Sequence, residues 1–183
     1  MDSVFKNVKD ERNNNSLKLQ IVLAADCAVG KTAFISRLYH KNFHDYMERD
    51  RCLNATLGFD SYLFILNYKG ITVELTIWDT EWLGSIRLFS QREIYERADI
   101  VFIFYQSSSR YSFDKIIHTK YFFDEYCKRN TIFALIRNKY DLYREEISDE
   151  EVLEFADKNN MLFFHLSLHE KMKLVLKNYL KMF

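Results

Sequence analysis

The chain of 183 residues has no proline and only four glycines. Few positions are therefore free to break a helix or to adopt a left-handed backbone. We expect each glycine to mark a place where the backbone has a special task; they are Gly30, Gly58, Gly70 and Gly84. The three cysteines are odd in number and widely spaced, which argues against a disulfide framework and against a zinc site.

The chain also has no net charge, because 26 basic residues balance 26 acidic ones. There is no basic stripe with stacking aromatic residues, which argues against nucleic-acid binding. The longest uninterrupted apolar run, residues 100–105, has the length of a buried strand, and the polar opening is unlike a secretory signal. We therefore expect a cytoplasmic protein.

Residues 1–16 carry charges and an Asn-Asn-Asn run without hydrophobic periodicity, and we predict a flexible leader there. The remainder, residues 17–183, is predicted to be one domain, since 48% of the chain is hydrophobic and can form a substantial core.

The stretch from Leu17 to Arg37 predicts a phosphate-binding loop. An apolar strand runs into Gly30, Lys31 and Thr32 and then into an amphipathic helix. Backbone N–H groups and the positive end of such a helix favour a polyphosphate. The strict pattern has another glycine five residues before Gly30, at position 25, where this chain has Ala25. We expect the methyl group of Ala25 to cause backbone strain or a close contact.

Downstream, strands alternate with helices, which predicts a largely parallel sheet with ligands at the carboxyl ends of its strands. The expected hairpin joins residues 61–68 and 71–78 through a tight turn at 69–70. Further strands are expected at residues 100–105, 131–136 and 161–165. Helices are expected at residues 86–97 and 111–129, from Ser148 with a capping box to Glu151, and at the end of the chain.

With this loop, an aspartate at position 79 and the run Asn138-Lys139-Tyr140-Asp141, the chain resembles the Ras superfamily of small GTPases, most nearly its Rab-like branch. The resemblance implies an α/β G-domain. Its sheet has six strands, mostly parallel with one antiparallel strand, and helices cover both faces. The implied function is a molecular switch that signals to effector proteins, with a link to vesicle trafficking.

The resemblance implies GTP or GDP and Mg²⁺ as ligands. Asp141 would accept hydrogen bonds from the guanine ring N–H and the exocyclic amine, a pair that adenine cannot offer. The implied nucleotide-binding residues are Cys27, Ala28, Val29, Gly30, Lys31, Thr32, Thr56, Asn138, Lys139, Asp141, Ser167 and Leu168. The implied metal-side residues are Thr32, Thr56 and Asp79.

The chain departs from the family pattern where hydrolysis is carried out. The family's Asp-Thr-Ala-Gly-Gln appears here as Asp79-Thr80-Glu81-Trp82-Leu83. Leu83 occupies the position of the catalytic glutamine, so no catalytic residue is assigned, and we expect slow or impaired GTP hydrolysis.

Two alternatives stay open from the sequence. The first is a pseudo-GTPase that keeps the fold as a protein-interaction module, and the second is a P-loop kinase with a small substrate. Short matches also resemble, more weakly, the septation GTPases of the fungal spindle pole. No cysteine follows Cys127, so we expect no prenyl group and no direct membrane anchor. The expected partners are effector, exchange-factor and GTPase-activating proteins, which would also provide any recruitment to membranes or organelles; the oligomeric state stays open.

Overall fold

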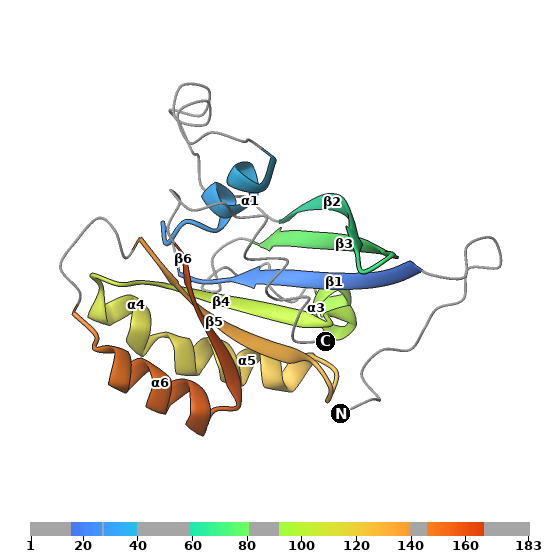
Figure 1. Ribbon diagram of the computed structural model, residues 1–183. Coiled ribbons are helices and arrows are strands. Elements are labelled where there is room, and N and C mark those ends of the chain that lie inside the picture. The colour runs from blue at the N-terminus through green and yellow to red at the C-terminus, as the bar shows by residue number, and fades with distance from the viewer. Residues whose placement is uncertain (1–15, 27, 40–58, 81–91, 140–145, 167–183) are drawn as a thin grey trace.

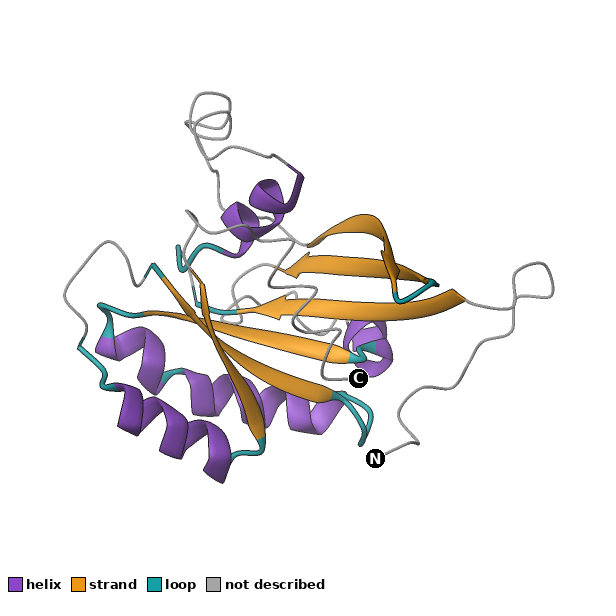
Figure 2. Ribbon diagram, in the orientation of Figure 1, coloured by secondary structure: helices purple, strands orange, loops and turns teal. Residues whose placement is uncertain are grey.

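The computed structural model describes residues 16–26, 28–39, 59–80, 92–139 and 146–166. Strands and helices alternate along most of these ranges (Figures 1 and 2). The strands are β1 (Ser16–Ala24), β2 (Phe59–Tyr68), β3 (Ile71–Thr80), β4 (Ile100–Gln106), β5 (Ile132–Asn138) and β6 (Met161–Leu166). The helices are α1 (Lys31–Tyr39), α3 (Arg92–Arg97), α4 (Arg110–Asp114), α5 (Ile116–Tyr126) and α6 (Asp149–Lys158).

The six strands form one sheet in the order β2-β3-β1-β4-β5-β6. All neighbouring strands are parallel except the β2–β3 pair. The predicted fold, a mostly parallel sheet with one antiparallel strand, is therefore confirmed. Because five strands run the same way, the carboxyl ends of β1, β3, β4 and β5 meet at one edge of the sheet.

The predicted hairpin is confirmed, with its tight turn at Lys69 and Gly70. Both residues have a left-handed backbone, with φ of 50° and 81°. Two such residues in succession give the kind of turn whose twist matches that of the flanking strands. β2 is an edge strand, and its residues alternate between exposed and half-buried positions over most of its length.

Two apolar layers cover the two faces of the sheet. On one face α1 packs through residues such as Phe34, whose ring meets the rings of Phe102 and Phe104 edge-on at centroid distances of 6.1 and 5.4 Å. On the other face the buried residues of α3, α4, α5 and α6 pack against the alternate side chains of β1, β4 and β5. Helices on both faces were predicted, and this is confirmed.

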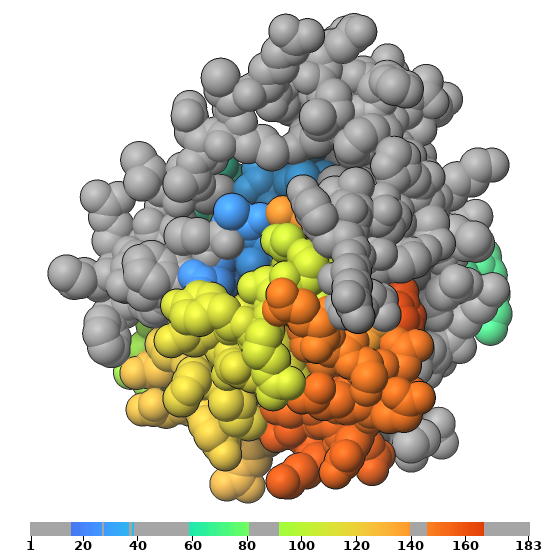
Figure 3. Space-filling view, turned by 90° about the vertical axis from the view of Figure 1, so that its left-hand side faces the viewer, coloured from blue at the N-terminus to red at the C-terminus, as the bar shows by residue number. Residues whose placement is uncertain are grey.

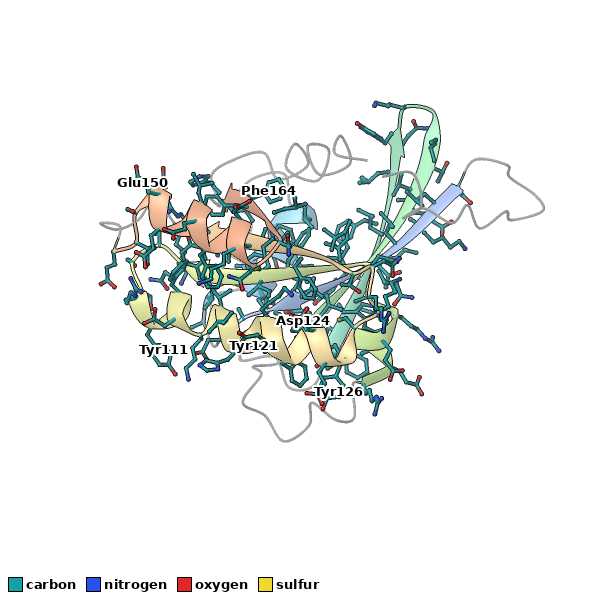
Figure 4. The ribbon with its side chains drawn as sticks, turned by 90° about the horizontal axis from the view of Figure 1, so that it is seen from below. Tyr111, Tyr121, Asp124, Tyr126, Glu150 and Phe164 are labelled. Atoms are coloured by element: carbon teal, nitrogen blue, oxygen red, sulfur yellow. The ribbon has the colours of Figure 1, made fainter. Side chains whose placement is uncertain are left out.

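The predicted helix 111–129 is wrong in its boundaries. Lys115 separates α4 from α5, and α5 ends at Tyr126 because Cys127 has an extended backbone, with φ −83° and ψ 158°. Figure 4 looks onto these two helices, with Tyr111 and Tyr121 at their outer surface, 62% and 65% exposed. Of the predicted helix 86–97, the described part is α3, and the predicted C-terminal helix lies outside the described residues.

The predicted start of α6 is confirmed, since the Ser148 side chain accepts a hydrogen bond from the backbone N–H of Glu151 at 3.2 Å. Such a cap satisfies one of the N–H groups that a helix leaves free at its start. Over the described ranges, we find no helix with the length and apolar character that a membrane crossing needs.

Candidate nucleotide-binding site

The loop between β1 and α1 contains two left-handed residues, Ala28 with φ 58° and Gly30 with φ 108°. Loops with such alternating backbone angles form concave surfaces lined by N–H groups, which suit anions. Ala25 is 2% exposed and is not among the residues with positive φ. Of the two expectations for position 25, the unusual backbone angle is wrong, since the positive φ lies at Ala28, and the close contact stays a prediction.

Gly30 has both an unusual backbone angle and a close neighbour. A Cβ atom added at this position would lie 2.5 Å from the Nδ2 atom of Asn138, well inside contact distance. The backbone angle and the close contact each exclude a side chain at position 30. This explains why Gly30 is retained although the glycine expected at position 25 is replaced by an alanine.

Asn138 and Lys139 approach the loop from the end of β5. Asn138 Nδ2 donates to the carbonyl oxygen of Val29 at 2.8 Å, and Lys139 Nζ donates to that of Ala28 at 2.9 Å. Partial burial lowers the pKa of Lys139. The residues predicted to bind the base thus hold the phosphate loop, across a sequence separation of 109 residues for Asn138 and Val29.

Lys31 is 9% exposed at the start of α1 and lies over the first half of the loop. Its Nζ atom donates to the carbonyl oxygens of Ala25 at 3.4 Å and of Asp26 at 3.5 Å. Both contacts are long for hydrogen bonds of an ammonium group. The ammonium group therefore lies beside the loop, where the sequence predicts that it meets a phosphate.

Thr32 and Asp79 place two oxygen atoms side by side. The Thr32 hydroxyl donates to Asp79 Oδ2 at 2.6 Å, although the residues are 47 positions apart. Asp79 is fully buried near the end of β3, where Thr80 fixes the strand to β1 by donating to the carbonyl oxygen of Leu23 at 2.8 Å. A hydroxyl and a carboxylate are hard oxygen ligands of the kind that Mg²⁺ prefers, so the pair fits that ion.

The sequence reasoning missed Ser107, which is 1% exposed and follows β4. Its hydroxyl donates to the carbonyl oxygen of Lys139 at 3.1 Å, and its N–H donates to that of Asn138 at 3.1 Å. The Ser107 carbonyl oxygen accepts the N–H of Glu146 at 3.1 Å. Ser107 thus binds the chain on both sides of residues 140–145. Its position in a Ser-rich turn carried no signal for this role.

Eight predicted site residues meet at the carboxyl edge of the sheet, where the space-filling view brings the β1–α1 segment next to the ends of β4 and β5 (Figure 3). They are Ala28, Val29, Gly30, Lys31, Thr32, Asp79, Asn138 and Lys139. The other predicted residues lie outside the described residues. They are Cys27, Thr56, Asp141, Ser167 and Leu168, together with Leu83 at the glutamine position.

A family model described as the Ras family matches residues 20–181. The chain belongs to the Ras family. The curated relatives include Ras-related protein Rab-18 of Caenorhabditis briggsae, 29% identical over 165 residues that cover 90% of this chain and 78% of the relative. Rab-18-B of Danio rerio is 30% identical over 150 residues, 81% of this chain and 70% of the relative. Rab-5A of Dictyostelium discoideum is 28% identical over 157 residues, which cover 85% of this chain and 74% of the relative.

The identification of a Rab-like small GTPase from its motifs is therefore confirmed. The weaker similarity to the septation GTPases stays a prediction.

Proposed function

We propose that the protein is a guanine-nucleotide-dependent switch that binds GTP and GDP with Mg²⁺ and hydrolyses GTP slowly. The observation that carries this proposal is the convergence of three distant segments. The phosphate loop, the aspartate at the end of β3 and the Asn-Lys pair at the end of β5 are joined by side-chain hydrogen bonds of 2.6 to 2.9 Å. A nucleotide needs phosphate, metal and base contacts at one place, and the family supplies the expectation that the base is guanine.

In this proposal Lys31 neutralises the phosphates, and the Thr32 hydroxyl with the Asp79 carboxylate holds Mg²⁺. The metal would screen the phosphate charge. Asn138 and Lys139 set the shape of the loop through the carbonyl groups of Ala28 and Val29. Base selection is assigned to Asp141 from its position in the Asn-Lys-x-Asp run.

The nucleotide content of the purified protein tests this function most simply. The protein is denatured, and the supernatant is separated by ion-exchange chromatography with GDP, GTP, ADP and ATP standards. We expect GDP or GTP in near-stoichiometric amount. No bound nucleotide, together with no rise in melting temperature on adding GDP and Mg²⁺, would contradict the proposal, and adenine nucleotide alone would favour the kinase alternative.

Slow hydrolysis is proposed from the run Glu81-Trp82-Leu83. Leucine has no amide with which to orient the attacking water, and an indole stands where the family has a glycine. Loss of one preorganised donor typically lowers a rate by about 10² to 10³.

Single-turnover hydrolysis of bound GTP in three proteins tests this point: the unaltered chain, Leu83→Gln, and Leu83→Gln combined with Trp82→Gly. We expect the rate to rise in that order. A wild-type rate of about 10⁻⁴ per second, as in ordinary relatives, or no gain in either variant, would contradict it.

A pseudo-GTPase is the second candidate, and the observation in its favour is the same altered run. In that case the fold would serve as an interaction module and the protein would be isolated without nucleotide. For either function we propose effector and exchange-factor proteins as partners, and membrane recruitment only through such partners. Tight binding of the purified protein to protein-free liposomes would refute the last point.

A further inference from the structure

Gln106 ends β4 beside the two residues that hold the phosphate loop. In the register of the sheet it lies opposite Asn138 of β5, and residues that lie opposite each other send their side chains to the same face. That face carries α1, because Phe104 and Ile136, two residues earlier on each strand, pack in the same apolar layer as Phe34. The Gln106 side chain therefore leaves the sheet on the side of the loop between β1 and α1.

The side-chain amide of Gln106 links Lys139 to the turn after β4. Its Oε1 atom accepts a hydrogen bond from the Lys139 ammonium group at 3.3 Å, and its Nε2 atom donates to the Ser108 hydroxyl at 2.9 Å. The backbone N–H of Gln106 donates to the hydroxyl of Ser112 at 3.0 Å. The residue is thus held both at its backbone and at its side chain.

The same ammonium group of Lys139 also donates to the carbonyl oxygen of Ala28, at 2.9 Å. Ala28 and Lys139 both have a left-handed backbone, with φ of 58° in each residue. Such a backbone is strained in a residue that has a Cβ atom, and it persists where surrounding contacts hold it in place. Both residues therefore depend on contacts with their neighbours, and the bond from Gln106 to Lys139 is one of these contacts.

The direction of the Ala28 carbonyl group determines what the loop presents to an anion. In a planar trans peptide, the carbonyl group and the N–H group of the next residue point in opposite directions. Because the Ala28 oxygen is held toward Lys139, the N–H group of Val29 points to the other side of the loop. A lysine that stays on this oxygen thus fixes the direction of an N–H group that can bind a phosphate.

We propose that Gln106 is a positioning residue of the nucleotide site, which holds the Lys139 ammonium group on the Ala28 carbonyl oxygen and thereby slows the release of the nucleotide. The proposal rests on the proposed function and deepens it. It adds a residue that belongs neither to the phosphate loop nor to the Asn-Lys-x-Asp run.

A purely stabilising role at the end of β4 is the competing explanation, and three variants separate the two. Gln106→Leu removes the acceptor and the donor together at similar volume. Gln106→Glu keeps the acceptor for Lys139 but loses the donor to Ser108, so it retains slow release only if the contact with the ammonium group matters. Ser108→Ala is the mildest variant, because it keeps Gln106 and removes only the hydroxyl that orients its amide.

The matched control is Gln20→Leu, the same substitution at another half-buried position. Gln20 lies in the middle of β1, and its backbone N–H and carbonyl groups form hydrogen bonds with Asp99, before the start of β4. These bonds remain when the side chain is replaced.

The experiment measures the rate at which a fluorescent GDP analogue dissociates in the presence of Mg²⁺ and excess unlabelled GDP. We expect dissociation to be on the order of tenfold faster in Gln106→Leu and about threefold faster in Ser108→Ala. The rate of Gln106→Glu should lie closer to that of the wild type than to that of Gln106→Leu. Gln20→Leu should stay within about twofold of the wild type.

A double-mutant cycle with Lys139→Met shows whether the effect passes through the ammonium group. Changes that remove the same contact are not additive. Once Lys139 is replaced, Gln106→Leu should therefore change the dissociation rate by less than about twofold. A loss of stability in β4 would instead produce its full effect in both backgrounds.

Unchanged dissociation in both Gln106→Leu and Ser108→Ala would overturn the positioning role, and so would additive effects in the cycle. Release from Gln106→Glu that is as fast as from Gln106→Leu, or an equally large effect of Gln20→Leu, would overturn it too. Failure of the wild type to bind the fluorescent nucleotide would instead refute the proposed function, and the role of Gln106 with it.

Discussion

The two halves of the phosphate loop are held in different ways. In the first half, the carbonyl oxygens of Ala25 and Asp26 accept long hydrogen bonds of 3.4 and 3.5 Å from Lys31. In the second half, those of Ala28 and Val29 accept bonds of 2.9 and 2.8 Å from the two residues at the end of β5. The first half thus lies beside a lysine that we expect to contact a phosphate, whereas the second half is held by the Asn-Lys pair that is predicted to bind the base.

This difference explains which departures from the glycine pattern the loop tolerates. Position 25 has no left-handed backbone, so an alanine fits there. Gly30 is left-handed and packs against the amide of Asn138, so it can carry no side chain. Backbone preorganisation is therefore concentrated in the second half, where a loss should affect both phosphate and base binding.

The largest effect is expected for Gly30→Ala. We predict a loss of about 2 to 4 kcal/mol in the free energy of unfolding, from backbone strain together with the contact to Asn138 Nδ2 at 2.5 Å. Urea unfolding in the absence of nucleotide measures it.

Gly70→Ala is the matched control, because Gly70 also has positive φ but an added Cβ would meet nothing within 4 Å. It should lose only about 1 kcal/mol. Equal losses in the two variants would mean that the contact with Asn138 is unimportant.

Smaller effects of opposite sign are expected for the two alanines. Ala28→Gly should gain about 0.5 kcal/mol, because relief of the left-handed strain slightly exceeds the added entropy of the unfolded chain. Ala25→Gly should lose about 1 kcal/mol, since a buried methyl group is removed and no strain is relieved. Thermal unfolding of both variants measures the changes, and a gain in Ala25→Gly would contradict the assignment of the strain to Ala28.

The smallest effect is a pH dependence from Lys139. Burial lowers its pKa from the usual 10.5, so just below pH 10.5 the unfolded chain binds more protons at this residue than the folded chain does. The free energy of unfolding of the wild type should therefore rise with pH in that range, relative to Lys139→Met. Urea unfolding of both proteins between pH 8 and about 10.5 measures this difference. Parallel curves, or a difference that falls with pH, would argue against burial of this ammonium group.

Local sequence patterns predicted most of the fold and much of the site. The alternation of strands with helices predicted the largely parallel sheet. Lys69 and Gly70 predicted the hairpin turn, and Ser148 predicted the start of α6. The site residues came from motifs that follow strands, and parallel strands bring their carboxyl ends to one edge. The contact between Thr32 and Asp79 could therefore be predicted from the sequence.

The remaining features depend on contacts with no local signal. Ser107 and Arg137 form hydrogen bonds with other elements, and nothing in their own segments predicts these contacts. The break at Lys115 likewise lies inside a continuous helical pattern. The glycine pattern alone predicts an unusual backbone angle or a close contact at position 25, whereas the positive φ lies three residues later, at Ala28.

The measurement that tests the central claim most directly is calorimetric titration of the nucleotide-depleted protein with GDP and with ADP in the presence of Mg²⁺. If the phosphate loop, the metal-side pair and the Asn-Lys motif form one guanine-nucleotide site, GDP should bind at least about 100-fold more tightly than ADP. Asn138→Ala should weaken GDP binding, because it frees the carbonyl oxygen of Val29 and removes the side chain that packs on Gly30. Equal affinity for the two nucleotides, or no binding of either, would contradict the account.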